Sequence, residues 1–232
     1  MASLRLATKR IWTIVGQRMK CGALWTFVPF LVLLLAPGSL ATAHPVPRRT
    51  YDRTVQVRLT HDAVEVLYRL EVDEWTVVYV DLDAVRDQVD LTKLSGPREF
   101  YDAFTRCYSP ILASNLTARL DGQPLSFTCT RHGHQVLDHL RCDFVFRAAW
   151  KPAPGQPHEF SFRDDNYTLE SGALRLSLEP AAGVSLVQID QPSEALRARS
   201  SADLQPGDDA KRRRASATFE LTSTPAPTAA PP

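Results

Sequence analysis

The sequence lacks the short motifs by which most catalytic sites are recognised. It contains no G-x-S-x-G, no glycine-rich phosphate loop, no H-E-x-x-H and no C-x-x-C. Each of these motifs places a nucleophile, a phosphate or a metal at a defined turn or helix face, and none of that chemistry is signalled here. We therefore expect that the chain is not an enzyme and has no catalytic residues.

Acidic residues and a long apolar run are both missing from the first part of the chain. No Asp or Glu precedes Asp52, and the apolar stretch Ala23–Ala36 has only 14 residues. A helix that spans a bilayer needs about 20, whereas a short apolar run behind basic residues is typical of an export signal. Residues 1–43 are predicted to be a signal peptide, with Met19 as an alternative start. The mature chain is expected in the bacterial periplasm or at the extracellular face of the membrane.

An excess of positive charge is missing once this signal is removed. Residues 1–43 hold five basic and no acidic residues, which leaves 22 basic against 26 acidic residues and a net charge of −4. A mildly acidic protein has no electrostatic attraction for nucleic acid, so we expect no nucleic-acid partner. The remaining length fits one domain over 44–221, followed by a Pro/Ala/Thr-rich tail or linker over 222–232.

What the mature sequence does contain is alternation of apolar and polar residues. YDRTVQVRLT and AVEVLYRLEV, on either side of a short polar turn, predict a hairpin. The continuously apolar WTVVYVDL (residues 75–82) predicts a third strand, covered on both faces. Further short strands follow residue 116, with a hairpin signal at Asp121-Gly122 and a last strand over 215–221.

The period of the pattern changes between residues 97 and 113. Phe100, Phe104 and Tyr108 recur every three to four residues behind Pro97, which predicts a helix packed on the sheet. Pro110 favours a kink or a stop, so regular helix is expected to end near residue 109, with a looser turn beyond it. The predicted fold is mainly β, an antiparallel Ig-like β-sandwich with one inserted α-helix around residues 97–113.

The segment CTRHGHQVLDHLRC concentrates the side chains that bind soft metals. Besides Asp138 it holds two thiols and three imidazoles, those of Cys129, Cys142, His132, His134 and His139. One interpretation is a long hairpin closed by a Cys129–Cys142 disulfide, which leaves Cys107 reduced. The other is a site for zinc, copper or nickel, although the spacing matches no standard zinc motif. Both can hold in part, because oxidised thiols leave the histidines able to bind a metal.

The new N-terminus is a second candidate metal site. Cleavage after Ala41-Thr42-Ala43 releases His44, and cleavage after Ser39-Leu40-Ala41 releases Thr42. The first pattern is the stronger signal, and it lets the α-amine and imidazole of His44 chelate one metal ion. The second gives Thr-Ala-His, whose amine, two amides and imidazole form a square plane that favours Cu(II) or Ni(II). A solvated terminus without a metal is the alternative.

Three other polar segments carry weaker signals. Asp164-Asp165-Asn166 is most simply a turn, and Lys211–Arg214 is expected to be a solvated basic loop. Asn115 and Asn166 stand in Asn-x-Thr sequons, which matter only in a eukaryotic secretory route.

Several mature segments, taken in order, resemble a known kind of domain. AHPVPRRTYDRTVQVRLT, YRLEVDEWTVVYVDL, PREFYDAFTRCYSPILASNL, LRCDFVFRAAWKPAPG and NYTLESGALRLSL are similar to the extracytoplasmic N-terminal domain of some bacterial nickel/cobalt-type transporters, the NicO and HupE/UreJ-like group. The resemblance covers about residues 43–221. It implies a β-rich accessory domain associated with nickel/cobalt transport, with a membrane transporter as partner. Together with the chelating terminus, it makes Ni(II), Co(II) or Cu(II) the candidate metals.

The chain departs from that family in two respects. The printed sequence contains no hydrophobic helix after its Pro-rich tail, which leaves two alternatives, a stand-alone relative or a transporter truncated at its linker. His134-x3-Asp138-His139 misses the H-x4-D-H spacing of the transporters' membrane motif. That role is not carried over, and transport by this chain alone is not expected. Two functions remain open, a non-catalytic accessory domain of nickel/cobalt transport and a secreted interaction module with no metal role.

The exported chain is predicted to begin at His44. Intact mass spectrometry of the secreted product measures this directly. An uncleaved chain, or a first residue beyond His44, would contradict the prediction.

Overall fold

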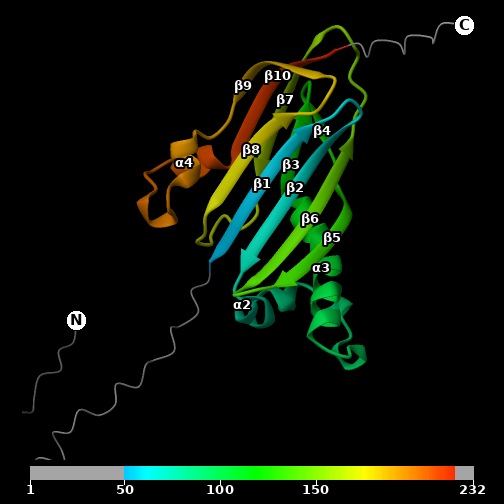
Figure 1. Ribbon diagram of the computed structural model, residues 1–232, viewed down its shortest axis with the longest axis vertical. Coiled ribbons are helices and arrows are strands. Elements are labelled where there is room, and N and C mark those ends of the chain that lie inside the picture. The colour runs from blue at the N-terminus through cyan, green and yellow to red at the C-terminus, as the bar shows by residue number, and fades with distance from the viewer. Residues whose placement is uncertain (1–49, 223–232) are drawn as a thin grey trace, which may run out of the picture. The chain divides into compact units, whose positions relative to one another are not determined.

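The computed structural model describes residues 50–222, apart from the side chains of Tyr79 and Leu91. In this part of the chain two five-stranded sheets pack against each other, with short helices at one end and along one edge (Figure 1). The predicted signal peptide, His44 and the segment from Ser223 onward lie outside the described residues. Within residues 50–222 no helix is both long and apolar enough to cross a membrane.

The first sheet is mixed. Its order is β5 (Thr128–Val136), β6 (Leu140–Ala149), β2 (Ala63–Val72), β1 (Tyr51–Leu59) and β8 (Leu174–Pro180). The predicted β1–β2 hairpin is confirmed, with Val55 opposite Tyr68. The expectation that all strands are antiparallel is wrong, because β8 runs parallel to β1, with Val55 opposite Leu176. The strand that precedes β8 in the chain is β7, which belongs to the other sheet. No hairpin therefore joins β8 to β1, and the two strands can run in the same direction.

The second sheet is antiparallel throughout. Its order is β4 (Gln123–Leu125), β3 (Leu116–Leu120), β7 (Pro157–Asp164), β10 (Arg214–Leu221) and β9 (Val184–Asp190). The predicted turn at Asp121-Gly122 is confirmed, and both residues have positive φ, at 49° and 76°. Such a turn matches the twist of a hairpin, and glycine adopts it without strain. Between β9 and β10 lie α4 (Glu194–Ala198), a 3-10 turn (Ser201–Asp203) and α5 (Asp208–Arg212).

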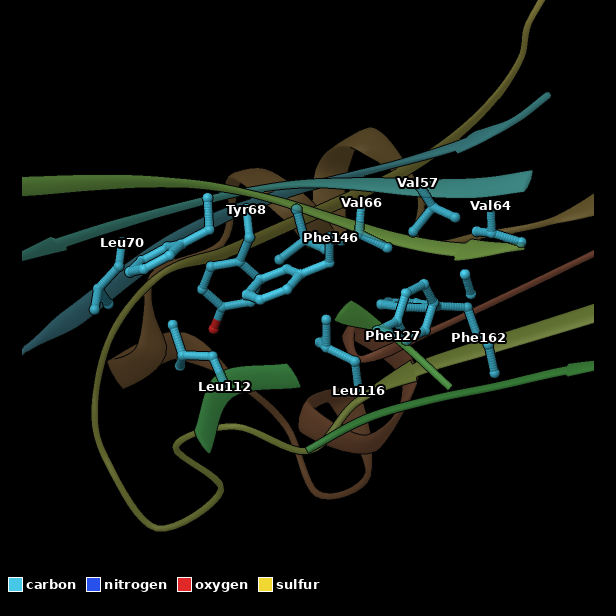
Figure 2. Close-up of a cluster of buried hydrophobic side chains, with 14 of the residues drawn as sticks. Val57, Val64, Val66, Tyr68, Leu70, Leu112, Leu116, Phe127, Phe146 and Phe162 are labelled. Carbon is cyan, nitrogen blue, oxygen red and sulfur yellow. The ribbon is translucent and has the colours of Figure 1, made fainter. Parts of the chain in front are cut away.

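The core lies between the two sheets. Side chains that alternate along each strand point inward, as the period of two requires. Figure 2 shows residues of β1, β2 and β6 facing residues of β3, β7, the β4–β5 connection and the long helix, among them Val57, Val66, Phe146, Leu112, Leu116, Phe127 and Phe162. Burial of each of these side chains stabilises the fold by about 1.5–3 kcal/mol.

The predicted third strand over residues 75–82 is wrong. The segment forms α2 (Glu74–Tyr79) and the 3-10 turn Asp81–Ala84. The Asp73 carboxylate accepts a hydrogen bond of 2.8 Å from the Trp75 amide and so caps the new helix. Both edges of β2 are already paired, with β1 and β6, so the sheet has no place for a strand that follows β2 directly. A continuous apolar run does not by itself distinguish a strand from a short helix. Two further 3-10 turns, Arg86–Gln88 and Leu91–Lys93, lead to the long helix.

The predicted helix is confirmed and extends further than expected. Helix α3 (Pro97–Ser114) continues through Pro110. Proline has no amide hydrogen, so the Arg106 carbonyl loses its usual helical donor. The hydroxyl of Ser109 donates a hydrogen bond of 3.1 Å to this carbonyl instead, which satisfies the backbone at the proline and lets the helix continue.

Candidate functional site

The histidine-rich segment forms the predicted hairpin, but without the predicted disulfide. Strands β5 and β6 pair with Cys129 opposite Phe146 and with His134 opposite Cys142. Cys129 and Cys142 are therefore about 13 Å apart along the hairpin, whereas a disulfide needs Cα atoms within about 7 Å. Cys107, Cys129 and Cys142, the cysteines of the described residues, are all free thiols.

The turn of the hairpin explains the error. The chain reverses at residues 137–139, where the Leu137 amide bonds the His139 carbonyl at 3.0 Å. This turn is displaced toward β6 from the middle of the Cys129–Cys142 segment, and a bulge between Cys129 and Arg131 shifts the register once more. The disulfide prediction assumed that the segment was symmetric about its centre.

His132 and His134 lie on the face of β5 that packs against α3. The Nδ1 atom of His132 and the Thr105 hydroxyl are hydrogen-bonded at 3.2 Å. The Nδ1 atom of His134 lies 3.1 Å from Oδ1 of Asp102, and the centroid of its ring is 5.6 Å from that of the Tyr101 ring. The two histidines are two residues apart on β5, and their partners Asp102 and Thr105 are three residues apart on α3. These contacts hold α3 against the edge strand of the mixed sheet.

His139 is separated from this pair. It lies in the hairpin turn, with Nε2 at 3.9 Å from Oε1 of Glu71. Within residues 50–222 no group of three or more His, Cys, Asp or Glu side chains has the geometry to hold a metal ion. The structure thus does not bring His132, His134 and His139 together as ligands, and His44 lies outside the described residues. Metal binding by these four residues stays a prediction.

Asp102, His134 and Cys142 resemble a nucleophilic triad only in residue type. Cys142 is fully buried opposite His134. Burial raises the pKa of its thiol to about 12, and the charges of Asp143 and Asp81 add to the shift. A thiol attacks as the thiolate, so the environment of Cys142 is that of a packing residue.

A buried polar cluster within residues 50–222 was not predicted from the sequence. Arg53 on β1 and Asp164 at the end of β7 form an ion pair of 3.3 Å, and both side chains are completely buried. Arg53 also donates to the Asn166 carbonyl. Asn166 in turn donates from its side chain to Asp164 at 2.9 Å and to the Leu112 carbonyl of α3 at 3.2 Å. The cluster therefore links both sheets to α3.

The basic run Lys211–Arg214 supplies the second half of this cluster. Its expected role as a solvated loop is wrong for Arg212 and Arg213, which are 3% exposed. Arg213 donates to the Asn166 and Tyr167 carbonyls at 2.7 and 3.1 Å, and its Nε pairs with Asp209 at 2.6 Å. The arginine fork satisfies several backbone carbonyls at once. Asp164-Asp165-Asn166 does leave the strand in a turn, as predicted, but Asp164 and Asn166 are buried, which takes the Asn166 sequon out of solvent.

His158 is a buried histidine that the sequence did not single out. Its Nδ1 lies 2.7 Å from the Asp121 carboxylate and its Nε2 lies 2.7 Å from the Ala153 carbonyl. Both partners are acceptors, so the ring can donate to both of them only when each nitrogen carries a proton. Burial opposes this charge, but the bonds to Ala153 and Asp121 outweigh it and raise the pKa of His158. The pair fastens the β3–β4 turn to β7.

Comparison with known proteins adds no family to these observations. No protein-family model matches the chain, and no curated protein matches its sequence.

Replacing Arg213 by Ala is expected to lower the free energy of unfolding by about 2–4 kcal/mol, because buried carbonyls lose their donors. Arg214→Ala is the matched control: Arg214 is the next residue along the chain and is exposed, so its loss should change stability by about 0.5 kcal/mol or less. Urea unfolding measures both. Equal effects of the two substitutions would contradict the assignment.

Replacing His158 by Gln is expected to destabilise the protein in a pH-dependent way. The folded-state pKa of His158 lies above its ordinary value of 6.5. Its contribution is therefore complete below pH 6.5 and is lost as the pH rises through the folded-state value.

The measurement is the urea midpoint from about pH 5 to pH 9 for the parent and for two variants. The difference in urea midpoint between the parent and His158→Gln should narrow toward high pH. The exposed His61 provides a control, because His61→Gln should leave the pH profile of the parent unchanged. A constant difference across the range would show that the charge of His158 does not matter.

Proposed function

We propose that this chain is a non-catalytic, exported accessory domain of nickel/cobalt-type transport, which binds Ni(II), Co(II) or Cu(II) at its mature N-terminus and works beside a membrane transporter. The sequence supports the proposal through its export signal, its resemblance to the N-terminal domains of such transporters, and two cleavage patterns that each expose a chelating terminus. We also propose that the fold is Ig-like, and the two packed sheets are compatible with this, since face-to-face sheets are the basic feature of an Ig-like sandwich.

The observation that favours His44 as the metal ligand is that the hairpin histidines His132 and His134 already contact α3. His132 is bonded to Thr105, and His134 lies beside Asp102. A metal at these rings would compete with the contacts that dock the helix. His44 is the remaining strong candidate, because an α-amine and an imidazole on one residue chelate without help from the fold.

A second candidate function is a secreted interaction module with no metal role. The observation that favours it is a rigidly held loop after β7 whose tip residue, Leu169, is 95% exposed. The two functions differ in a simple way, since the first requires a metal and the second does not.

Calorimetric titration of the mature protein with Ni(II) or Cu(II) tests the proposal. We expect one metal per chain with a dissociation constant below about 1 µM. Binding should weaken as the pH falls through the imidazole range, because the ligands must lose protons to coordinate. His44→Ala should abolish it.

The control replaces His132, His134 and His139 by Ala together, with circular dichroism to show that the variant is folded. This variant should keep most of the binding. Binding that survives His44→Ala but is lost in the triple variant would move the metal to the hairpin. Absence of binding by the parent would favour the interaction module.

A further inference from the structure

The segment Asp165–Ser171, here called the β7–β8 loop, joins the two sheets at the end where β1 begins (Figure 1). Residues 168–171 are exposed, and Leu169 is 95% exposed at the tip. The Glu170 amide bonds the Tyr167 carbonyl at 3.3 Å, so Thr168 and Leu169 occupy the centre of a tight turn. The loop therefore presents one aliphatic side chain to solvent.

The first end of this loop is fixed by buried groups. Arg53 and Arg213 both bond the Asn166 carbonyl, and Arg213 also bonds the Tyr167 carbonyl. Tyr167 has a φ of 53°, which is unfavourable for a bulky side chain. Its ring stacks on Tyr51 at 4.2 Å and its hydroxyl donates to that of Tyr108 at 3.0 Å. These contacts hold a residue that a free chain would not place this way.

The second end is fixed at Gly172. A Cβ atom there would lie 2.1 Å from the Tyr51 carbonyl oxygen, and its φ is 152°. The Ser201 hydroxyl accepts from the Gly172 amide at 3.1 Å and bonds the Gly172 carbonyl at 2.6 Å. Arg212 donates to the same carbonyl at 3.2 Å. Both ends of the β7–β8 loop are thus held while its tip makes no part of the core.

From this geometry we infer that the β7–β8 loop is a protein-recognition element, which inserts Leu169 into an aliphatic pocket of a partner protein. Fixing a loop in its bound conformation before association removes the entropy cost of ordering it. Strained backbone held by surrounding structure is concentrated at functional sites, and one well-placed anchor side chain often carries much of a binding energy. The inference goes beyond the proposed metal role and requires no metal.

Charge around the loop defines the partner further. Glu170 adjoins Leu169, and the backbone bridge between Thr50 and Ser171 brings the loop beside β1. A hollow of about 240 Å³ at that place is lined by Thr50, Val72 and His139 together with three carboxylates, those of Asp52, Glu71 and Asp73. Complementary charge fits an acidic surface to a basic one. The partner is therefore a protein whose aliphatic pocket is bordered by Lys or Arg.

The first experiment measures whether the loop is rigid in the free mature chain. Nitrogen-15 relaxation should give order parameters of about 0.85 for the amides of residues 166–172, as in regular strands. Values below about 0.6 would overturn the inference, because a flexible loop is not preorganised.

The second experiment identifies and tests the partner. A photo-crosslinking amino acid replaces Leu169 in the full chain, expressed in the cells that naturally secrete it, and replaces Val187 as the control. Val187 lies on β9 and is 62% exposed, so it is an accessible apolar residue outside the loop. A protein adduct formed from position 169 and not from position 187 is then purified and titrated with the mature chain.

Affinity of that protein decides the outcome. Leu169→Ala should weaken binding by about tenfold or more, Leu169→Met should retain it, and Val187→Ala should leave it unchanged. Higher salt should also weaken it, as expected for opposite charges. The inference would be overturned if Leu169→Ala left the affinity unchanged, or if positions 169 and 187 gave equal adducts. It would also be overturned if position 169 gave no adduct, or gave an adduct only with lipid or with a second copy of this chain. The titration is made without added metal, so it is independent of the outcome for His44.

Discussion

The buried ion pair between Arg53 and Asp164 is the constraint on which the rest of the structure depends. It joins β1 of the mixed sheet to β7 of the antiparallel sheet, and both side chains are completely shielded from water. Two charges without solvent are tolerated only when each is paired and hydrogen-bonded, and removing one leaves the other uncompensated. The sheets are therefore held in one relative position, and the chain between β7 and β8 must pass through the cluster that this pair forms.

Several features of the fold follow from that position. Asn166 reaches from the ion pair to the end of α3, and Arg213 closes the cluster from the start of β10. The same carbonyls that accept hydrogen bonds from the arginines belong to the β7–β8 loop, which leads into β8 parallel to β1. A loop whose two ends are hydrogen-bonded to buried groups is also suited to recognition, because its tip is exposed while its ends are held.

The β5–β6 hairpin contains side chains that can bind a metal or form a disulfide, but that serve packing in this fold. Thiols and imidazoles in close sequence suggested a disulfide or a metal. In the fold, Cys142 packs inside the sandwich, and His132 and His134 face α3. Side chains with metal-binding chemistry thus serve packing and helix docking, and the proposed metal role rests instead on the α-amine and imidazole of His44.

The sequence by itself determined the features that depend on near neighbours. Alternation defined the β1–β2 pair, Asp121-Gly122 defined the β3–β4 turn, and aromatic spacing defined α3, since each needs contacts between residues close in the chain. Only the tertiary structure decided the register of β5 on β6, the helical state of residues 74–79 and the parallel entry of β8. It also decided the burial of Arg53, whose partner Asp164 is 111 residues away. No local pattern encodes such a pairing, because the acceptors that meet Arg53, the Asp164 carboxylate and the Asn166 carbonyl, come from a distant part of the chain.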